Sequence, residues 1–154
     1  GTSSSAATMP VTLASTKKNG VSNAVAGFVV PLCATIHLSG SMVKITCFSI
    51  AVMILSGTSV TLGSFLPFIF MLGLMMIAAP GVPGGAIAAA AGLLTQMLGF
   101  GDIEIGLMFA TYIALDSFGT ATNVTGDGAI ALIMDKLSKG KLLEHKKADL
   151  EPVT

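Results

Sequence analysis

Charged residues are scarce in this chain. Eight basic and eight acidic side chains make up only 10% of its 154 residues, whereas 53% are hydrophobic. A soluble domain carries roughly 25% charged residues, so this composition excludes an ordinary soluble domain. The formal net charge is zero, which gives no indication of nucleic-acid binding. The composition instead indicates a protein that lies in lipid.

The middle of the chain has almost no charges. Between residues 21 and 134 the only charged residues are Lys44, Asp102, Glu104, Asp116 and Asp127. A helix of about 20 apolar residues is long enough to span a bilayer. A stretch this long with so few charges therefore predicts an all-α, multi-pass membrane protein.

Cysteine motifs and a signal peptide are also missing. Cys33 and Cys47 both lie in apolar runs, without CxxC spacing and without a histidine cluster. Their surroundings predict buried small side chains rather than a disulfide or a zinc site. The chain opens at Gly1 directly into hydroxyl residues, and we expect it to be a fragment of a longer protein.

The first half of the chain contains two predicted helical segments. Residues 1–18 end at Lys17-Lys18-Asn19-Gly20, a helix stop at a water interface. Residues 21–56 are apolar, except at His37-Leu38-Ser39-Gly40-Ser41. One uninterrupted helix would measure roughly 50 Å at about 1.5 Å per residue, longer than a hydrocarbon core of about 30 Å. The polar centre therefore predicts a broken transmembrane helix with two halves.

Residues 63–100 contain two short apolar runs around an uncharged turn, Pro80-Gly81-Val82-Pro83-Gly84-Gly85. Each arm is roughly 23 Å long as a helix. We expect a re-entrant hairpin whose tip stops at mid-depth, where exposed backbone is tolerated only beside a cavity or inside protein. An ordinary hairpin with two full spans is the alternative.

Residues 104–137 are predicted to form one last transmembrane helix, followed by a polar tail at residues 138–154. The lysines in and beside this tail are Lys136, Lys139, Lys141, Lys146 and Lys147. Lysine excess marks the cytoplasmic side of a membrane. The tail and the Lys17-Lys18 pair are therefore expected on the cytoplasmic side of the membrane. Residues 56–62, Asp102 and Glu104 are expected on the outer side.

The last helix carries a polar stripe. Its members are spaced by 4, 3 and 4 residues and are Asp116, Thr120, Asn123 and Asp127. At about 100° per residue they share one helix face, and Gly119 and Gly126 beside it leave room for a ligand. A charged residue at a helix centre costs about 3 kcal/mol in lipid. Both acids are therefore expected to bind cations, either a metal ion or a substrate ammonium. Protonation, or pairing with Lys44, is the alternative.

Four motifs resemble those of the dicarboxylate/amino acid:cation symporter family, which has the glutamate-transporter fold. SSSAATMPVT at residues 3–12 resembles the tip of its first hairpin, and PLCATIHLSGS at 31–41 resembles the PLGATINMDGT of its seventh helix. GVPG at residues 81–84 resembles the second hairpin tip, and NVTGD at 123–127 the eighth helix. The resemblance extends to about residue 137. It implies a C-terminal transport core in the cell membrane, homotrimeric when full length, with residues 1–18 as the second arm of the first hairpin.

The resemblance also implies a substrate site. Asp116 would bind the substrate's amino group, with Thr120 and Asn123 beside it, and the two hairpin tips would close over it. The candidate substrate-binding residues are Ser4, Ser5, Ser41, Val82, Gly84, Asp116, Gly119, Thr120 and Asn123.

Sodium sites are implied by the same resemblance. One would use Asp127, Asn123 and the carbonyl of Cys33. The other would use the carbonyls of Thr35, Ile77 and Ala79. His37, a further candidate, could couple protons instead, or it could be a hydrogen-bonded structural residue.

Three departures from the family pattern bear on the substrate. Gly119 replaces the arginine that pairs with an acidic substrate, and it leaves an apolar gap. This argues against glutamate or aspartate as the substrate, because an unpaired buried charge is costly. Ser39 replaces the carboxylate of a third cation site, which predicts fewer sodium ions. Lys44 could be a tethered cation near that site, replace the arginine, or snorkel to the outer interface.

We therefore predict a secondary active symporter, not an enzyme, that couples sodium or proton entry to uptake of a non-acidic amino acid or a small carboxylate. The alternative is a symporter of acidic amino acids or dicarboxylates in which Lys44 replaces the arginine. A remote alternative is an intramembrane aspartyl protease, but its GxGD motif is not met at residues 124–127. A channel is a further class, and sodium-dependent, substrate-dependent uptake would distinguish a carrier from it.

Overall fold

The computed structural model describes residues 1–148, with side chains described through residue 138. Its helices are α1 (Ser5–Lys18), α2 (Asn23–Ile36), α3 (Ser39–Leu55), α4 (Leu62–Ala78), α5 (Gly85–Leu98), α6 (Asp102–Ala114) and α7 (Asp116–Ala148). No strand occurs among residues 1–148. The predicted all-α class is confirmed.

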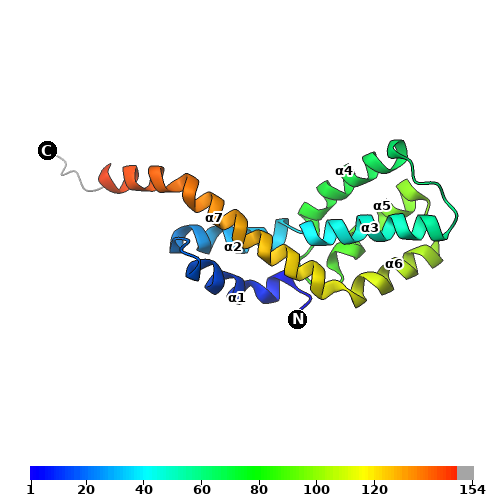
Figure 1. The fold of residues 1–154 in the computed structure, drawn as a ribbon, viewed down its shortest axis with the longest axis horizontal. Coiled ribbons are helices and arrows are strands. Elements are labelled where there is room, and N and C mark those ends of the chain that lie inside the picture. The colour runs from blue at the N-terminus through cyan, green and yellow to red at the C-terminus, as the bar shows by residue number, and fades with distance from the viewer. Residues whose placement is uncertain (149–154) are drawn as a thin grey trace.

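The helices form two groups that meet along α7 (Figure 1). In the first group, α1 and α2 pack on each other and on α7, around a small core that includes Val30 and Ala131. In the second, α3 to α6 surround a larger core that includes Phe68, Leu72 and Ile87. The first turns of α7 also contact α3. The polar stripe of α7 therefore lies where the two groups join.

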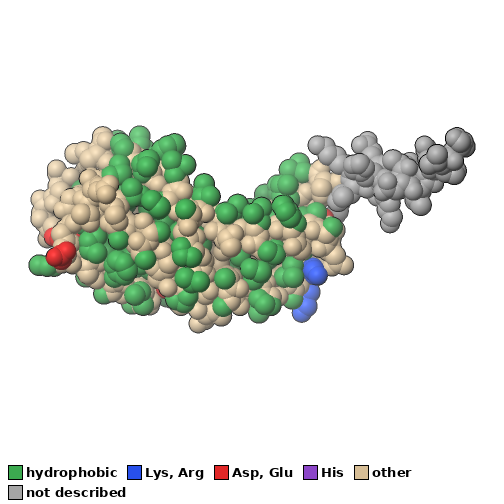
Figure 2. Space-filling view, turned by 180° about the vertical axis from the view of Figure 1, so that it is seen from behind, with side chains coloured by type: hydrophobic (Ala, Val, Ile, Leu, Met, Phe, Trp, Pro, Cys, Tyr) green, Lys and Arg blue, Asp and Glu red, His purple; other side chains and the backbone are tan. Residues whose placement is uncertain are grey.

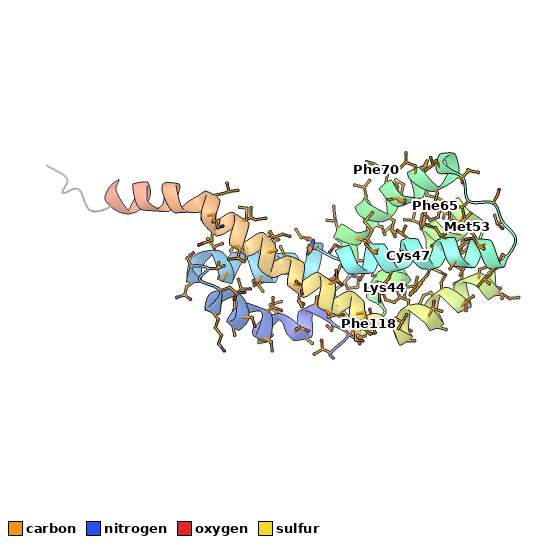
Figure 3. The ribbon with its side chains drawn as sticks, viewed as in Figure 1. Lys44, Cys47, Met53, Phe65, Phe70 and Phe118 are labelled. Atoms are coloured by element: carbon orange, nitrogen blue, oxygen red, sulfur yellow. The ribbon has the colours of Figure 1, made fainter. Side chains whose placement is uncertain are left out.

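On the face shown in Figure 2, hydrophobic side chains are exposed along the whole length of the described part. In that view, acidic side chains appear at one end and basic side chains at the other, with hydrophobic side chains between them. Phe28 and Phe70 are 68% and 69% exposed, and Phe70 points away from the bundle (Figure 3). Such a large exposed apolar area is typical of a surface that is covered in the working protein.

Among the described residues, one helical stretch is long and apolar enough to cross a membrane, namely α2 and α3 together over Asn23–Leu55. The helices α4 and α5 are apolar but shorter. The break inside this stretch lies between Ile36 and Ser39, where the sequence places its polar centre. The last intrahelical bond of α2 runs from the amide of His37 to the carbonyl of Cys33, at 2.8 Å.

The prediction of one continuous last helix was wrong. The segment divides at Leu115 into α6 and α7, and α6 begins at Asp102. Neither proline nor glycine lies at the division, so local sequence gives no stop signal there. Helix ends leave carbonyl groups without intrahelical partners, and here Lys44 of α3 donates to the carbonyls of Tyr112 and Leu115. The Leu115 carbonyl also accepts from the amide of Phe118 at 3.2 Å. The polar tail was also placed outside a helix, but α7 continues through Ala148; residues 149–154 lie outside the described part.

Candidate functional site

Residues from five parts of the chain converge on one small cavity. Its wall consists of Ser3, Ser5, Leu38, Ser41, Pro80, Gly81, Val82, Ala86, Tyr112, Asp116, Thr120 and Asn123. The volume open to the centre of a water molecule is about 10 Å³, which is room for roughly one water. Six of the nine candidate substrate-binding residues line this cavity, and it is closed in this structure.

The remaining three candidates lie at its margin. Ser4 caps α1 by accepting a bond from the amide of Ala7 at 3.1 Å, and it donates to the carbonyl of Gly81 at 2.9 Å. The amide of Gly84 donates to Asp116 at 3.1 Å. Gly119 lies beside Lys44. The tips at Ser4 and Gly81 thus touch each other and close the cavity on that side.

A buried hydrogen-bond network fixes the polar stripe against α3. The side-chain oxygen of Asn123 accepts a bond from the amide of Gly40 at 2.8 Å, and its nitrogen donates to the hydroxyl of Ser41 at 3.4 Å. Tyr112 donates to the same hydroxyl at 2.8 Å. Unpaired polar groups would be costly at this depth, so the network holds α3, α6 and α7 in one arrangement. All four stripe residues are buried, which agrees with a shared inward face.

Lys44 points inward, toward the junction of α6 and α7 (Figure 3). Its Nζ lies 2.9 Å from Oδ1 of Asp116 and 3.6 Å from the centre of the Tyr112 ring. It also donates to the carbonyls of Tyr112 and Leu115, at 3.4 and 3.3 Å. These carbonyls belong to the end of α6, where a cation also compensates the helix dipole. The alternative that Lys44 snorkels to the outer interface is therefore wrong.

The apolar gap expected beside Gly119 is also absent. A β-carbon at Gly119 would lie 2.6 Å from Cε and 2.9 Å from Nζ of Lys44. The lysine therefore occupies the space that the missing side chain leaves. At Asp116 the structure shows the alternative to a bound metal ion or substrate ammonium, because that carboxylate is paired with Lys44.

The second stripe carboxylate, Asp127, is fully buried and partnered on one side only. Its Oδ1 lies 2.8 Å from Nδ1 of His37, while Oδ2 has no hydrogen-bond partner. A buried carboxylate oxygen without a partner is costly, and coordination of a hard cation would remove that cost. Of its proposed co-ligands, Asn123 already accepts the Gly40 amide, and the Cys33 carbonyl already accepts the His37 amide.

The other proposed cation ligands lie at two helix ends. Thr35 is in the last turn of α2, and Ile77 and Ala79 are at the end of α4. The two helices contact each other, and a β-carbon at Gly81 would meet the carbonyl of Ala34. Carbonyls in a last helical turn lack intrahelical partners and carry the negative end of the helix dipole. This location suits a cation held by carbonyl oxygens.

Within the described part of the chain, no three His, Cys, Asp or Glu side chains form a group that could hold a metal ion. Cys33 is buried as predicted, but Cys47 is exposed, contrary to prediction. Any cation site here therefore depends on single carboxylates together with backbone carbonyls or side-chain amide oxygens.

Several residues of the site were missed from sequence, and Tyr112 and Gly40 matter most for its geometry. Tyr112 contributes both its ring and its hydroxyl, and it is the only tyrosine of the chain. A lone buried tyrosine in an apolar helix needs a partner for its hydroxyl, and that signal was available. Gly40 was treated as part of the polar break, but its role is to allow close approach: a β-carbon there would lie 2.5 Å from the carbonyl oxygen of Gly119.

The geometry agrees with the comparison to known proteins. The sequence model of the sodium:dicarboxylate symporter family matches residues 1–137. The chain belongs to this family. It is therefore part of a membrane transporter and not an enzyme, which removes the aspartyl-protease alternative.

Similar proteins include excitatory amino acid transporter 1 of Homo sapiens, which is 32% identical over 98% of this chain. Excitatory amino acid transporter 3 of Mus musculus is 31% identical over 91% of the chain, and transporter 4 of the same species is 29% identical over 97%. The chain spans 27% of the length of each of these relatives.

Proposed function

We propose that this chain forms the transport core of a sodium-coupled symporter for an amino acid or a small carboxylate. The observation that carries the proposal is the closed polar cavity, to which hairpin tips, a broken helix and the stripe of α7 all contribute. Irregular backbone and helix ends at such a position hold substrate and ions in secondary transporters. The cavity is small because the tips at Ser4 and Gly81 are in contact, and substrate entry would require them to separate.

Sodium is the proposed coupling ion, and a proton is the alternative. Asp127, through its unpartnered Oδ2, would bind one ion together with Asn123 and the Cys33 carbonyl. The carbonyls at the ends of α2 and α4 would bind another, from Thr35, Ile77 and Ala79. Bound sodium would neutralise buried oxygen ligands and so favour the closed arrangement of these segments.

The substrate site is proposed to use the hydroxyls and amide around the cavity, with Asp116 at its centre. The preference for a non-acidic amino acid depended on an apolar gap beside Gly119, which Lys44 fills. That preference therefore loses its structural basis. Lys44 provides a cation near the position of the family arginine, although an ammonium is a point charge without the fork of a guanidinium.

We further propose that the full-length protein is a homotrimer of the cell membrane with a cytoplasmic C-terminal tail. Uptake into sodium-loaded and sodium-free proteoliposomes tests the function. Concentrative uptake of an amino acid or small carboxylate, driven by an inward sodium gradient, is the expected result. Substrate flux that never exceeds equilibration would contradict a symporter and would favour the channel alternative.

A further inference from the structure

The ammonium of Lys44 is surrounded by groups that bind cations. Nζ contacts the carboxylate of Asp116, the two carbonyls at the end of α6, and the face of the Tyr112 ring. An ammonium has three N–H donors, and three oxygen acceptors lie within 3.4 Å. The lysine side chain is only 11% exposed. The ammonium is therefore fully coordinated by the protein.

Asp116 in turn has both oxygens engaged. Oδ1 accepts from Lys44 at 2.9 Å, and Oδ2 accepts from the amide of Gly84 at 3.1 Å. The carboxylate is 4% exposed and its charge is balanced by the lysine. A substrate ammonium entering this cavity would have to displace Lys44, or bring a second positive charge beside it without a counter-charge. Either arrangement is unfavourable in a buried site.

The cavity still offers hydrogen-bond donors. The hydroxyl of Ser41 accepts bonds from Tyr112 and Asn123, so its own proton is free to be donated. Ser5 and Thr120, which also carry hydroxyls, line the same cavity. These groups suit a carboxylate, which only accepts hydrogen bonds.

We propose that Lys44 is a specificity-determining residue whose ammonium takes the place of a substrate amino group at Asp116. The site then selects carboxylates that lack an α-amino group. This inference rests on the proposed transport function and narrows its substrate class.

The experiment compares substrates that differ only in the amino group. Full-length protein in proteoliposomes is given a sodium gradient, and uptake of labelled succinate, aspartate, propionate and alanine is measured. In the wild type, succinate is expected to exceed aspartate, and propionate to exceed alanine. In Lys44→Met the ratio within each pair should move toward the amino acid by about ten- to a hundredfold, the value of a hydrogen bond to a charged group.

Two further variants keep the result interpretable. Lys18→Met removes an exposed lysine far from the cavity, and it should leave both ratios unchanged. The double variant Lys44→Met with Asp116→Asn leaves no carboxylate to bind the ammonium of an amino acid substrate. It removes both charges of the buried pair, so neither is left unpaired. It should retain the wild-type preference, whether or not the single variant folds.

Each outcome has one meaning. Sodium-driven uptake in which the wild type prefers aspartate and alanine would overturn this inference and leave the proposed function intact. Unchanged ratios in folded Lys44→Met would do the same. No sodium-driven uptake of these four compounds or of any other amino acid or small carboxylate would overturn the proposed function, and this inference with it.

Discussion

The imidazole of His37 lies directly against the backbone of Gly126, so close that a β-carbon at position 126 would overlap ring atom Cε1. Nδ1 of the same ring lies 2.8 Å from Oδ1 of Asp127. The glycine therefore makes space for the contact between the ring and the carboxylate. Position 126, next to Asp127 in the chain, affects the environment of the buried acid through the position of the His37 ring.

Substituting this glycine should displace the ring. Gly126→Ala is expected to lower the Tm of the detergent-solubilised full-length protein. In a protein that also carries His37→Ala, the same glycine substitution should lower the Tm much less, because the ring that it would clash with is gone. A double-mutant cycle should give a coupling energy of roughly 1–2 kcal/mol, within the range for residues in contact. Additive effects of the two substitutions would show that the ring does not occupy this position.

Removing the charge of Asp127 should abolish sodium coupling. Asp127→Asn keeps the size of the side chain and a polar group opposite His37, so the protein should still insert and fold. Sodium-driven uptake should fall to the level of protein-free vesicles, because an amide cannot neutralise a cation as a carboxylate does. Wild-type uptake with unchanged sodium dependence in this variant would rule out the site.

The close approach of α3 to α7 should not tolerate a methyl group at Gly40. A β-carbon there would lie 2.5 Å from the Gly119 carbonyl oxygen and 2.7 Å from Cβ of Thr122. Backbone cannot move aside as a flexible side chain can, so Gly40→Ala should destabilise by about 1–3 kcal/mol or more.

The matched control for Gly40 is Gly27→Ala, in α2. Nothing lies within 4 Å of the β-carbon it would add, and alanine is the better helix former by roughly 0.5–1 kcal/mol. Thermal unfolding of both variants should shift Tm in opposite directions. Equal Tm values would contradict the tight packing of α3 on α7.

The contact between the two tips should depend on Ser4. Ser4→Ala removes the α1 cap, worth about 1 kcal/mol, and also the bond to the Gly81 carbonyl. Hydrogen exchange in residues 80–85 should therefore accelerate. Thr61→Ala also removes a helix cap, at the exposed start of α4, and should leave that exchange unchanged. Equal exchange at residues 80–85 in both variants would mean that the Ser4 bond does not hold the tips together.

Local patterns were enough to predict much of the architecture. The scarcity of charge indicated a membrane protein, and the polar centre at residues 37–41 indicated the break between α2 and α3. The spacing of Asp116, Thr120, Asn123 and Asp127 predicted one shared face, because helical periodicity depends only on position along the chain. Four short motifs identified the family over residues 1–137.

Only the tertiary structure decided where Lys44 points and where the last helix divides. The two features are linked in the structure: the ammonium of Lys44 donates to the carbonyls of Tyr112 and Leu115, which lie 68 and 71 positions further along the chain. No local signal could reveal it, since a lysine side chain is long and flexible and its direction is set by the acceptors within its reach. The sequence by itself determined which face of α7 is polar and which segments are helical, except for the division at Leu115 and the helical residues 138–148. The fold decided which side chain pairs with each stripe carboxylate, Lys44 with Asp116 and His37 with Asp127, because that choice depends on contacts between distant segments.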